Sequence, residues 1–291
     1  MLPQYDHQII NSFYLWTEDR LARVGEASVT GISQSFVYSS LGTDVPANMY
    51  AYYSNDRQFL TIGEGTVEGE AIPSGIYIDG AFNPQSYTNT TGVIIDNYNG
   101  RVLVSSNVGK TATISGNFPR KEINTYITQH DEEELLLNQE FVVNGTSFLE
   151  STSQMGWDRY TIPAVFITQA QSDNQPFAIG GTDQTINNLT MVVITDNSYL
   201  LNGTMSLFKD TKTLQFPLLG AFNTPYGGFF DIKSIPYTYT GYTTGDQEYV
   251  RIDDVKTSVF KAGGRTLESL KGKYVGFVDF KLSSIRNPRI C

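Results

Sequence analysis

Residues 93–118 constrain the fold most, because their pattern is that of a β-meander with no helix between its strands. A β-branched run at 93–96 is followed by Asn99-Gly100, the dipeptide that favours a tight two-residue hairpin turn. Apolar residues return at 102–104, and apolar and polar residues alternate over 111–118, as in a strand with one buried face. Strands joined without a helix exclude a βαβ nucleotide-binding unit here and predict a small β-domain.

Strand patterns extend over the first part of the chain from residue 27 onward. They lie at 29–38, 49–53, 59–62 and 75–79, with 125–128 as the last, and clusters of Gly, Pro and Asn separate them. Short strands at intervals of roughly 8–12 residues are typical of sandwiches and barrels. We therefore predict a β-sandwich or barrel domain over residues 27–128.

The N-terminal segment, residues 1–26, has the pattern of one amphipathic helix at 6–24. Apolar residues recur there at three- and four-residue spacing, Asp6 can cap the start, and Gly25 can provide a left-handed stop. The charged residues near its end, Glu18, Asp19, Arg20 and Arg23, fall mostly on other faces. Such a helix either packs on its own domain or docks on a neighbouring subunit, and the sequence leaves both alternatives open.

The second part of the chain, residues 129–291, mixes helix and strand patterns. Asp131 is a candidate N-cap for a helix that begins with three glutamates, and Asp196 is a candidate cap for a second helix at 196–210. Strands are expected at 139–148, 162–168, 189–194, 249–260 and 274–285. Together with the β-rich domain, this part predicts an α+β fold that is mostly β.

Two long segments without a clear period, 171–187 and 211–244, are predicted to be loops. The second segment carries large apolar side chains at Phe216, Leu218, Phe222, Phe229 and Phe230. Loops longer than about 12–15 residues are usually functional or disordered, and an ordered loop must bury such side chains. We therefore expect interface loops in this α+β domain, covered by an adjacent subunit.

The composition argues against several classes of function. A formal net charge of −10 and a pI of about 4.7 disfavour a sequence-specific nucleic-acid-binding protein, since phosphate contacts need clustered Lys and Arg. Cys291 is the only cysteine, so neither an intramolecular disulfide nor a cysteine zinc site can form. No run is apolar enough to span a membrane, and the first residues lack the pattern of a signal peptide, so we expect synthesis in a reducing cytoplasm.

No pattern of catalytic, cofactor-binding or metal-binding residues stands out. The two histidines, His7 and His130, are isolated, and no nucleophile elbow, zinc-protease helix or Walker loop is present. The glycine-rich run at 180–184 lacks a lysine, and the acidic run at 131–134 suits a helix start better than a metal site. Asp158, within an aromatic run, is a weak candidate for a glycosidase carboxylate. We therefore predict a protein that is not an enzyme and uses no cofactor or metal.

Tyrosines cluster at 50–53 and at 237–242. Several amphipathic rings close together suit a protein interface or the stacking of sugars. The alternation of a β-strand produces the same pattern with no partner involved, and the sequence leaves both interpretations open.

The chain resembles virion proteins of tailed bacteriophages, in which a similar β-module recurs. The resemblance rests on three runs, Pro73-Ser-Gly-Ile-Tyr-Ile-Asp-Gly80, Ile95-Asp-Asn-Tyr-Asn-Gly-Arg-Val102 and Ile114-Ser-Gly-Asn-Phe118. Further runs at 132–136, 163–167 and 197–203 are similar to uncharacterised virion structural proteins encoded with head and tail genes, so that the resemblance extends loosely over residues 5–285. The strand–helix–strand order of the second domain is similar to that of tail-terminator and neck proteins, which form rings at the head–tail junction.

The resemblance implies a non-enzymatic structural protein that forms a homo-oligomeric ring in the neck or as a tail terminator. Its partners would be other neck and tail proteins, and an acidic lumen would let DNA pass without binding. Such a protein is made in the cytoplasm of the bacterial host, contacts no membrane and resides in the virion. Two alternatives of a different class remain, a baseplate or tail-fibre protein that binds host-surface glycan and a carbohydrate-active enzyme.

Overall fold

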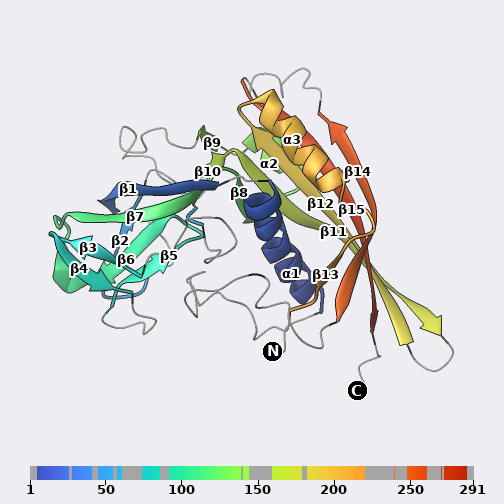
Figure 1. The fold of residues 1–291 in the computed structure, drawn as a ribbon, viewed down its shortest axis with the longest axis horizontal. Coiled ribbons are helices and arrows are strands. Elements are labelled where there is room, and N and C mark those ends of the chain that lie inside the picture. Colours follow the sequence, from blue (N-terminus) through green and yellow to red (C-terminus); the bar gives the residue numbers. More distant parts are fainter. Residues whose placement is uncertain are drawn as a thin grey trace.

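A computed structural model describes residues 5–25, 28–40, 45–54, 58–60, 74–85, 92–138, 140–143, 159–178, 182–219, 239, 248–260, 270 and 272–286. Figure 1 shows a first lobe made of strands β1 to β7 and a second lobe in which helices α1 and α3 lie against a long twisted sheet. The predicted class, an α+β fold that is mostly β and begins with a helix, is confirmed.

The first lobe is one curled sheet of seven strands in the order β4-β3-β7-β1-β2-β6-β5. The strands are β1 (Ser28–Ser39), β2 (Met49–Tyr53), β3 (Gly75–Ile78), β4 (Ala81–Pro84), β5 (Ile94–Asp96), β6 (Arg101–Ser105) and β7 (Ile114–Lys121), with a 3₁₀ turn at Ser106–Val108. Its core forms around Phe118, whose ring lies 4.6 Å from that of Phe59 and 5.2 Å from that of Phe36. Because Ile114, Gly116 and Phe118 are buried in alternation, the predicted face of this strand is confirmed.

The hairpin between β5 and β6 differs from the predicted two-residue turn. Asp96 pairs with Arg101, so the loop has four residues, 97–100, and only Gly100 among them has a positive φ, of 60°. The Asp96 carboxylate accepts hydrogen bonds from the backbone N–H of Asn99 at 3.2 Å and from its Nδ2 at 2.9 Å. These bonds hold a longer turn in which Asn99 does not need the left-handed conformation.

The second lobe contains a mixed sheet of six strands in the order β13-β14-β15-β12-β11-β8. The strands are β8 (Asn124–Ile127), β11 (Ala164–Ala178), β12 (Thr182–Thr195), β13 (Gln215–Pro217), β14 (Tyr249–Val259) and β15 (Tyr274–Arg286). A separate parallel pair consists of β9 (Glu140–Val143) and β10 (Arg159–Ile162).

The sequence predicts residues 125–128 to be the last strand of the first domain, but β8 belongs to the sheet of the second lobe. It pairs in parallel with β11, and the preceding residue Ile123 is buried in the core of the second lobe. The sequence pattern indicates a strand correctly but does not identify its partner, because a short parallel pairing depends on distant residues.

Helices cover the sheet of the second lobe in the described part of the chain. They are α1 (Tyr5–Asp19), which continues as a π-helical turn over Arg20–Val24, α2 (Glu132–Asn138) and α3 (Ser198–Lys209). Gly25 ends the first helix with a φ of −84°, so the expected left-handed stop is wrong. Asn197 rather than Asp196 caps α3, since its side chain accepts the Tyr199 N–H at 2.8 Å. Asp131 caps α2 as predicted, by accepting the Glu134 N–H at 2.7 Å.

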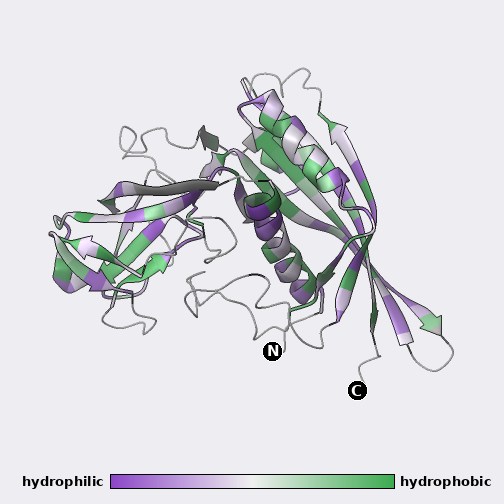
Figure 2. Cartoon of the chain, in the orientation of Figure 1, coloured by the Kyte–Doolittle hydropathy of each residue, from purple (hydrophilic) through white to green (hydrophobic). Residues whose placement is uncertain are grey.

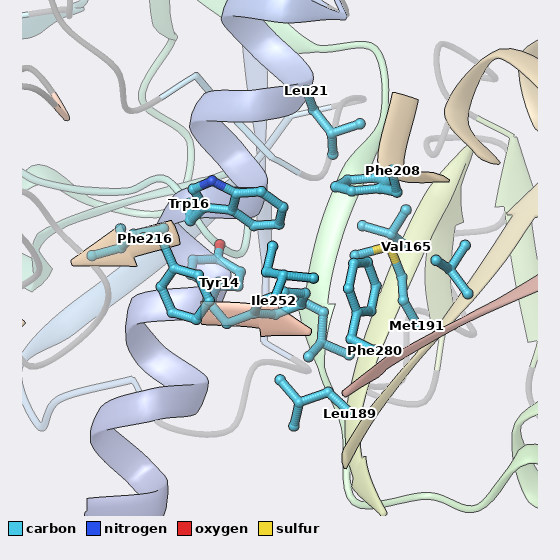
Figure 3. Packing of buried hydrophobic residues seen from close by; sticks show 14 of the residues in the cluster. Tyr14, Trp16, Leu21, Val165, Leu189, Met191, Phe208, Phe216, Ile252 and Phe280 are labelled. Carbon is cyan, nitrogen blue, oxygen red and sulfur yellow. The ribbon is translucent and has the colours of Figure 1, made fainter. Parts of the chain in front are cut away.

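Helix α1 packs on its own chain. Phe13 lies 4.9 Å from Phe280 of β15, and Trp16 lies 5.7 Å from Phe216 of β13 and 6.1 Å from Phe208 of α3, measured between ring centroids. Figure 3 shows Trp16 beside Phe208, Phe216 and Phe280 in this core. Of the two alternatives for this helix, packing within the subunit is therefore the one that the structure shows.

Both faces of the six-stranded sheet are covered near its centre. Helices α1 and α3 lie on one face, and α2 with the β9–β10 pair lies on the other, over buried residues such as Phe166 and Ile194. This arrangement makes the central strands β11 and β12 buried on both sides, which explains their long apolar runs.

The two segments predicted to be loops have different outcomes. Residues 171–178 and 182–187 form the outer part of a long hairpin between β11 and β12, paired from Gln171↔Asn188 to Ala178↔Thr182 with one register shift between Pro176 and Ala178. In the segment 211–244, Phe216 is fully buried against α1 of the same chain and Leu218 packs against the same core, so neither needs a neighbouring subunit. Phe222, Phe229 and Phe230 lie outside the described residues.

Candidate functional site

A buried polar network joins α1 to the first lobe. Lys121, at the end of β7, donates hydrogen bonds to Glu18 of α1 and to Gln58 Oε1, the latter at 3.1 Å. Glu18 also accepts the Tyr14 hydroxyl at 2.5 Å, and the Lys121 ammonium lies 5.8 Å from the centre of the Tyr14 ring. Both charges are removed from water, with the side chains of Lys121 and Glu18 only 6% and 1% exposed. A buried pair of this kind is sensitive to geometry, because each charge depends on its partner for solvation.

The same network extends to strand β8. Gln58 donates from Nε2 to the Thr125 carbonyl at 2.7 Å, and its Oε1 accepts the Thr125 N–H at 2.8 Å. One amide side chain therefore satisfies both backbone groups of a strand residue in the second lobe while it also contacts Lys121. These contacts connect the lobes through directional bonds, which favours a fixed orientation between them.

The outer part of β11 is exposed along its whole length, whereas the facing residues 182–188 of β12 are partly or fully buried. Every residue from 170 to 177 on β11 is exposed, and β8 pairs only with Ala164 to Ile167, so the outer edge beyond has no strand partner among the described residues. Strand β15 supports the other side as far as Asp183↔Arg286. Figure 1 shows this strand group extending beyond the body of the second lobe.

A hydrophobic patch lies at the end of this otherwise polar hairpin. Figure 2 shows hydrophilic strands with one hydrophobic region where β11 ends. Phe177 there is 55% exposed, and Ile285 at the end of β15 is also exposed. Exposed aromatic side chains on a projecting polar element are typical of contact surfaces rather than of folded cores.

The residues considered for chemistry are dispersed. His7 is exposed on α1, and His130 Nδ1 lies 2.9 Å from Glu134 Oε2 one turn along α2. No group of three or more His, Cys, Asp or Glu side chains that could hold a metal ion occurs among the described residues. Asp158 and Gly180 lie outside the described part, whereas residues 182–184 belong to β12.

Two adjacent carboxyl groups line an apolar groove behind the sheet. The groove, of about 370 Å³, is formed by α2 with Phe260 and Phe277. Burial, together with the nearby Asp279 and Asp131, raises the pKa of Glu132 at its rim. Glu133, the next residue of α2, also lines the groove, but none of the other described lining residues, Leu136, Leu137, Phe260 and Phe277, is a base or a nucleophile that could act with the two acids.

The tyrosines at 50–53 pack within the first lobe. Tyr38 lies 5.4 Å from Tyr50 and 5.8 Å from Tyr52, and the Lys110 ammonium lies 5.4 Å from the Tyr38 ring. Tyr52 also donates its hydroxyl to the Gly109 carbonyl at 2.6 Å. The alternation of a strand therefore accounts for this cluster, whereas of the cluster at 237–242 only Tyr239 is described.

Comparison with known proteins adds no relative. No protein-family model matches the chain, and no curated protein matches it significantly in sequence. Within the described ranges, no helix is both long and apolar enough to cross a bilayer. The candidate site therefore rests on geometry alone, which points to the projecting hairpin and to the network that fixes the body behind it.

Proposed function

We propose that this protein is a non-enzymatic structural protein of a tailed-bacteriophage virion, made in the bacterial host cytoplasm. In this proposal it assembles into a homo-oligomeric ring at the head–tail junction, as a neck or tail-terminator protein, and contacts other neck and tail proteins. The observation that carries the proposal is the projecting β11–β12 hairpin, with its exposed edge and terminal Phe177, on a body whose lobes are joined by buried bonds.

The mechanism is geometric. A ring closes only if each subunit presents its two contact surfaces at a fixed angle. The bonds from Gln58 to Thr125 and to Lys121 hold the two lobes in one orientation, and the hairpin provides a reaching element. Because a heterologous contact repeats the same rotation at every step, this fixed angle sets the number of subunits in the ring.

The negative charge of the protein suits a channel through which DNA passes without being bound. The formal net charge is −10, and the projecting hairpin carries Asp173 and Asp183 without a lysine or arginine from 164 to 195. A surface without clustered cations forms few phosphate contacts, so DNA can pass along it without a stable bond.

Electron microscopy of the purified full-length protein and of labelled virions tests the proposal. Rings with a central opening, together with a gold label on the single cysteine, Cys291, at the head–tail junction, would support it. A label located at the baseplate or fibres, or a protein absent from virions, would overturn it.

A second function, the binding of host glycan by a baseplate or tail-fibre protein, is favoured by one observation. Tyr77 and Phe82 face each other across the β3–β4 hairpin with ring centroids 5.5 Å apart, and the residues are 47% and 52% exposed. Paired exposed rings suit stacking on sugar rings. Binding of host polysaccharide that is lost in Tyr77→Ser would favour this function over the ring.

A further inference from the structure

A pocket lies beside the C-terminal end of α1, on the side of β13 and the start of β14. Its volume is about 340 Å³, and its walls include Trp16, Arg20, Arg23, Tyr239 and Tyr249. Three aromatic rings and two guanidinium groups thus converge on one cavity. This combination suits a ligand that carries an aromatic ring beside a carboxylate, since arginine binds carboxylates and its plane also stacks on rings.

Two polar groups of the pocket are buried without a partner among the described residues. They are Nε of Arg20 and the hydroxyl of Tyr239, a residue that is only 8% exposed. Arg23 differs, because its guanidinium already binds Asp19 at 2.8 Å. An unused buried donor costs free energy, and a carboxylate that reaches it recovers that cost. Arg20 and Tyr239 therefore mark the position where an acidic group fits.

The tip of the β11–β12 hairpin carries the complementary chemistry. Phe177 is exposed, and Asp183 lies beside it across the hairpin, since Pro176 pairs with Asp183 and Ala178 with Thr182. On its other side, Asp183 lies opposite Arg286 of β15 in the ladder. An exposed ring and a carboxylate near the end of one projecting hairpin match the aromatic walls and the arginine of the pocket.

The tip cannot reach the pocket of its own chain. Ser172 donates a hydrogen bond to Asp6 in the first turn of α1, and the hairpin continues outward for five more residues to Phe177. The pocket lies at Trp16 to Arg23, at the other end of the helix, about 20 Å away at 1.5 Å per residue. Tip and pocket are therefore separated within one subunit, so that a contact between them needs a second copy, as in a head-to-tail interface.

We propose that the hairpin tip of one copy docks in the α1 pocket of the next copy, with Phe177 between the aromatic rings and Asp183 on Arg20. The interface is heterologous, so it generates rings or helical filaments rather than closed dimers. The inference rests on the proposed ring and adds the contact that joins neighbouring copies. The same contact also applies to an assembly outside a virion.

A charge exchange between two full-length variants tests the contact. Arg20→Glu and Asp183→Lys should each weaken self-association at least about tenfold, as truncation of an interface anchor does. Mixed in equal amounts, the two variants should assemble again, because the lysine hairpin meets the glutamate pocket while the native hairpin meets the native pocket. Glu133→Lys, the same change of charge on an exposed residue of α2, is the matched control and should assemble normally.

A photo-cross-linker at position 177 provides a second measurement that does not depend on affinity. Benzoylphenylalanine in place of Phe177 should cross-link between chains to peptides that contain Trp16 or Tyr249. Phe177→Ser should weaken assembly, whereas Phe82→Ser, at an equally exposed ring of the first lobe, should not.

Three outcomes overturn the proposal. They are mixed variants that fail to assemble although each remains folded by circular dichroism, cross-links that map to another surface or another virion protein, and a wild-type protein that does not self-associate. If rings form without these cross-links, this contact is refuted and the ring function remains. If the cross-links form but the protein is absent from virions, only the proposed function is refuted.

Discussion

Removal of the Lys121 ammonium should destabilise the protein more than any exposed charge change. In Lys121→Met the side chain keeps most of its buried apolar stem and loses only the terminal ammonium group, so the change in packing at the end of β7 is small. What is lost is the ion pair with Glu18 and the hydrogen bond to Gln58 Oε1. The perturbation is therefore electrostatic and lies at the junction of α1 with the first lobe.

The magnitude follows from what each partner retains. Breaking a buried ion pair by removing one charge costs about 3–5 kcal/mol, because the other charge stays buried without compensation. Here Glu18 keeps the Tyr14 hydroxyl at 2.5 Å, and Gln58 Oε1 keeps the Thr125 N–H at 2.8 Å. The remaining bonds place the expected loss of unfolding free energy at the lower end, about 3 kcal/mol.

Equilibrium unfolding in urea, followed by circular dichroism and tryptophan fluorescence, measures this loss. The double variant Glu18→Leu, Lys121→Met should be more stable than Lys121→Met alone, because no unpaired charge remains buried. The control is Lys212→Met, since Lys212 forms a pair with Asp254 at 2.8 Å on the exposed surface and should leave stability near that of the wild type. A loss below about 1 kcal/mol in Lys121→Met, or a double variant as unstable as the sum of the singles, would refute the reasoning.

Three further predictions concern single positions. Gly100→Val should destabilise the first lobe by roughly 1–3 kcal/mol in thermal unfolding, because a β-branched residue resists the φ of 60° there. Gly203→Ala, at an exposed position of α3 where an added methyl group meets nothing within 4 Å, should instead stabilise by about 0.5–1 kcal/mol. Burial raises the pKa of Tyr239 above its ordinary 10.0, so the unfolded chain ionises first as the pH rises. Tyr239 should then contribute a fall in unfolding free energy of about 1.4 kcal/mol per pH unit above that value, a contribution that Tyr239→Phe removes and Tyr199→Phe, at an exposed ring, does not.

Local patterns predicted the elements well and their partners poorly. The helix at the N-terminus and strands such as β2, β14 and β15 follow from periodicity within a few residues, because each buries a continuous face. The partner of β8 and the length of the β5–β6 turn depend on contacts with residues far along the chain or on one side-chain carboxylate. Neither is visible in a short window of sequence.

The sequence predicts a loop where the structure has a hairpin, because the outer half of the hairpin has the composition of a loop. Residues 171–177 contain Gln, Ser, Asp, Asn and Pro, which disfavour strands, and they are exposed on both faces, so no apolar alternation marks them. Pairing with β12, and through it with β15, nevertheless continues the ladder outward. The aromatic residue Phe177 within this polar run is the one signal in the sequence that could have indicated a contact surface.

The network around Glu18 could not be found from the sequence either. Charged residues on a helix are expected to face water, and the pattern placed Glu18 away from the apolar face. Its burial requires Lys121 and Gln58, which come from other parts of the chain, so that only the folded structure brings the three together.

The exposed hairpin gives one more prediction, which separates a docking element from a passive extension. The outer part of β11 is an edge without a second strand partner among the described residues, and β15 supports β12 only as far as Asp183. In the unassembled protein, amides at 171–178 should therefore exchange hydrogen faster than those of the central part of β11, because the outer half opens locally. On assembly they should become protected, since a docked tip loses this freedom, while the β3–β4 hairpin at 75–84 should keep its rate. Hydrogen exchange followed by mass spectrometry measures both segments in one sample. Equal exchange at 171–178 before and after assembly would mean that the hairpin projects freely and that the subunits contact each other elsewhere.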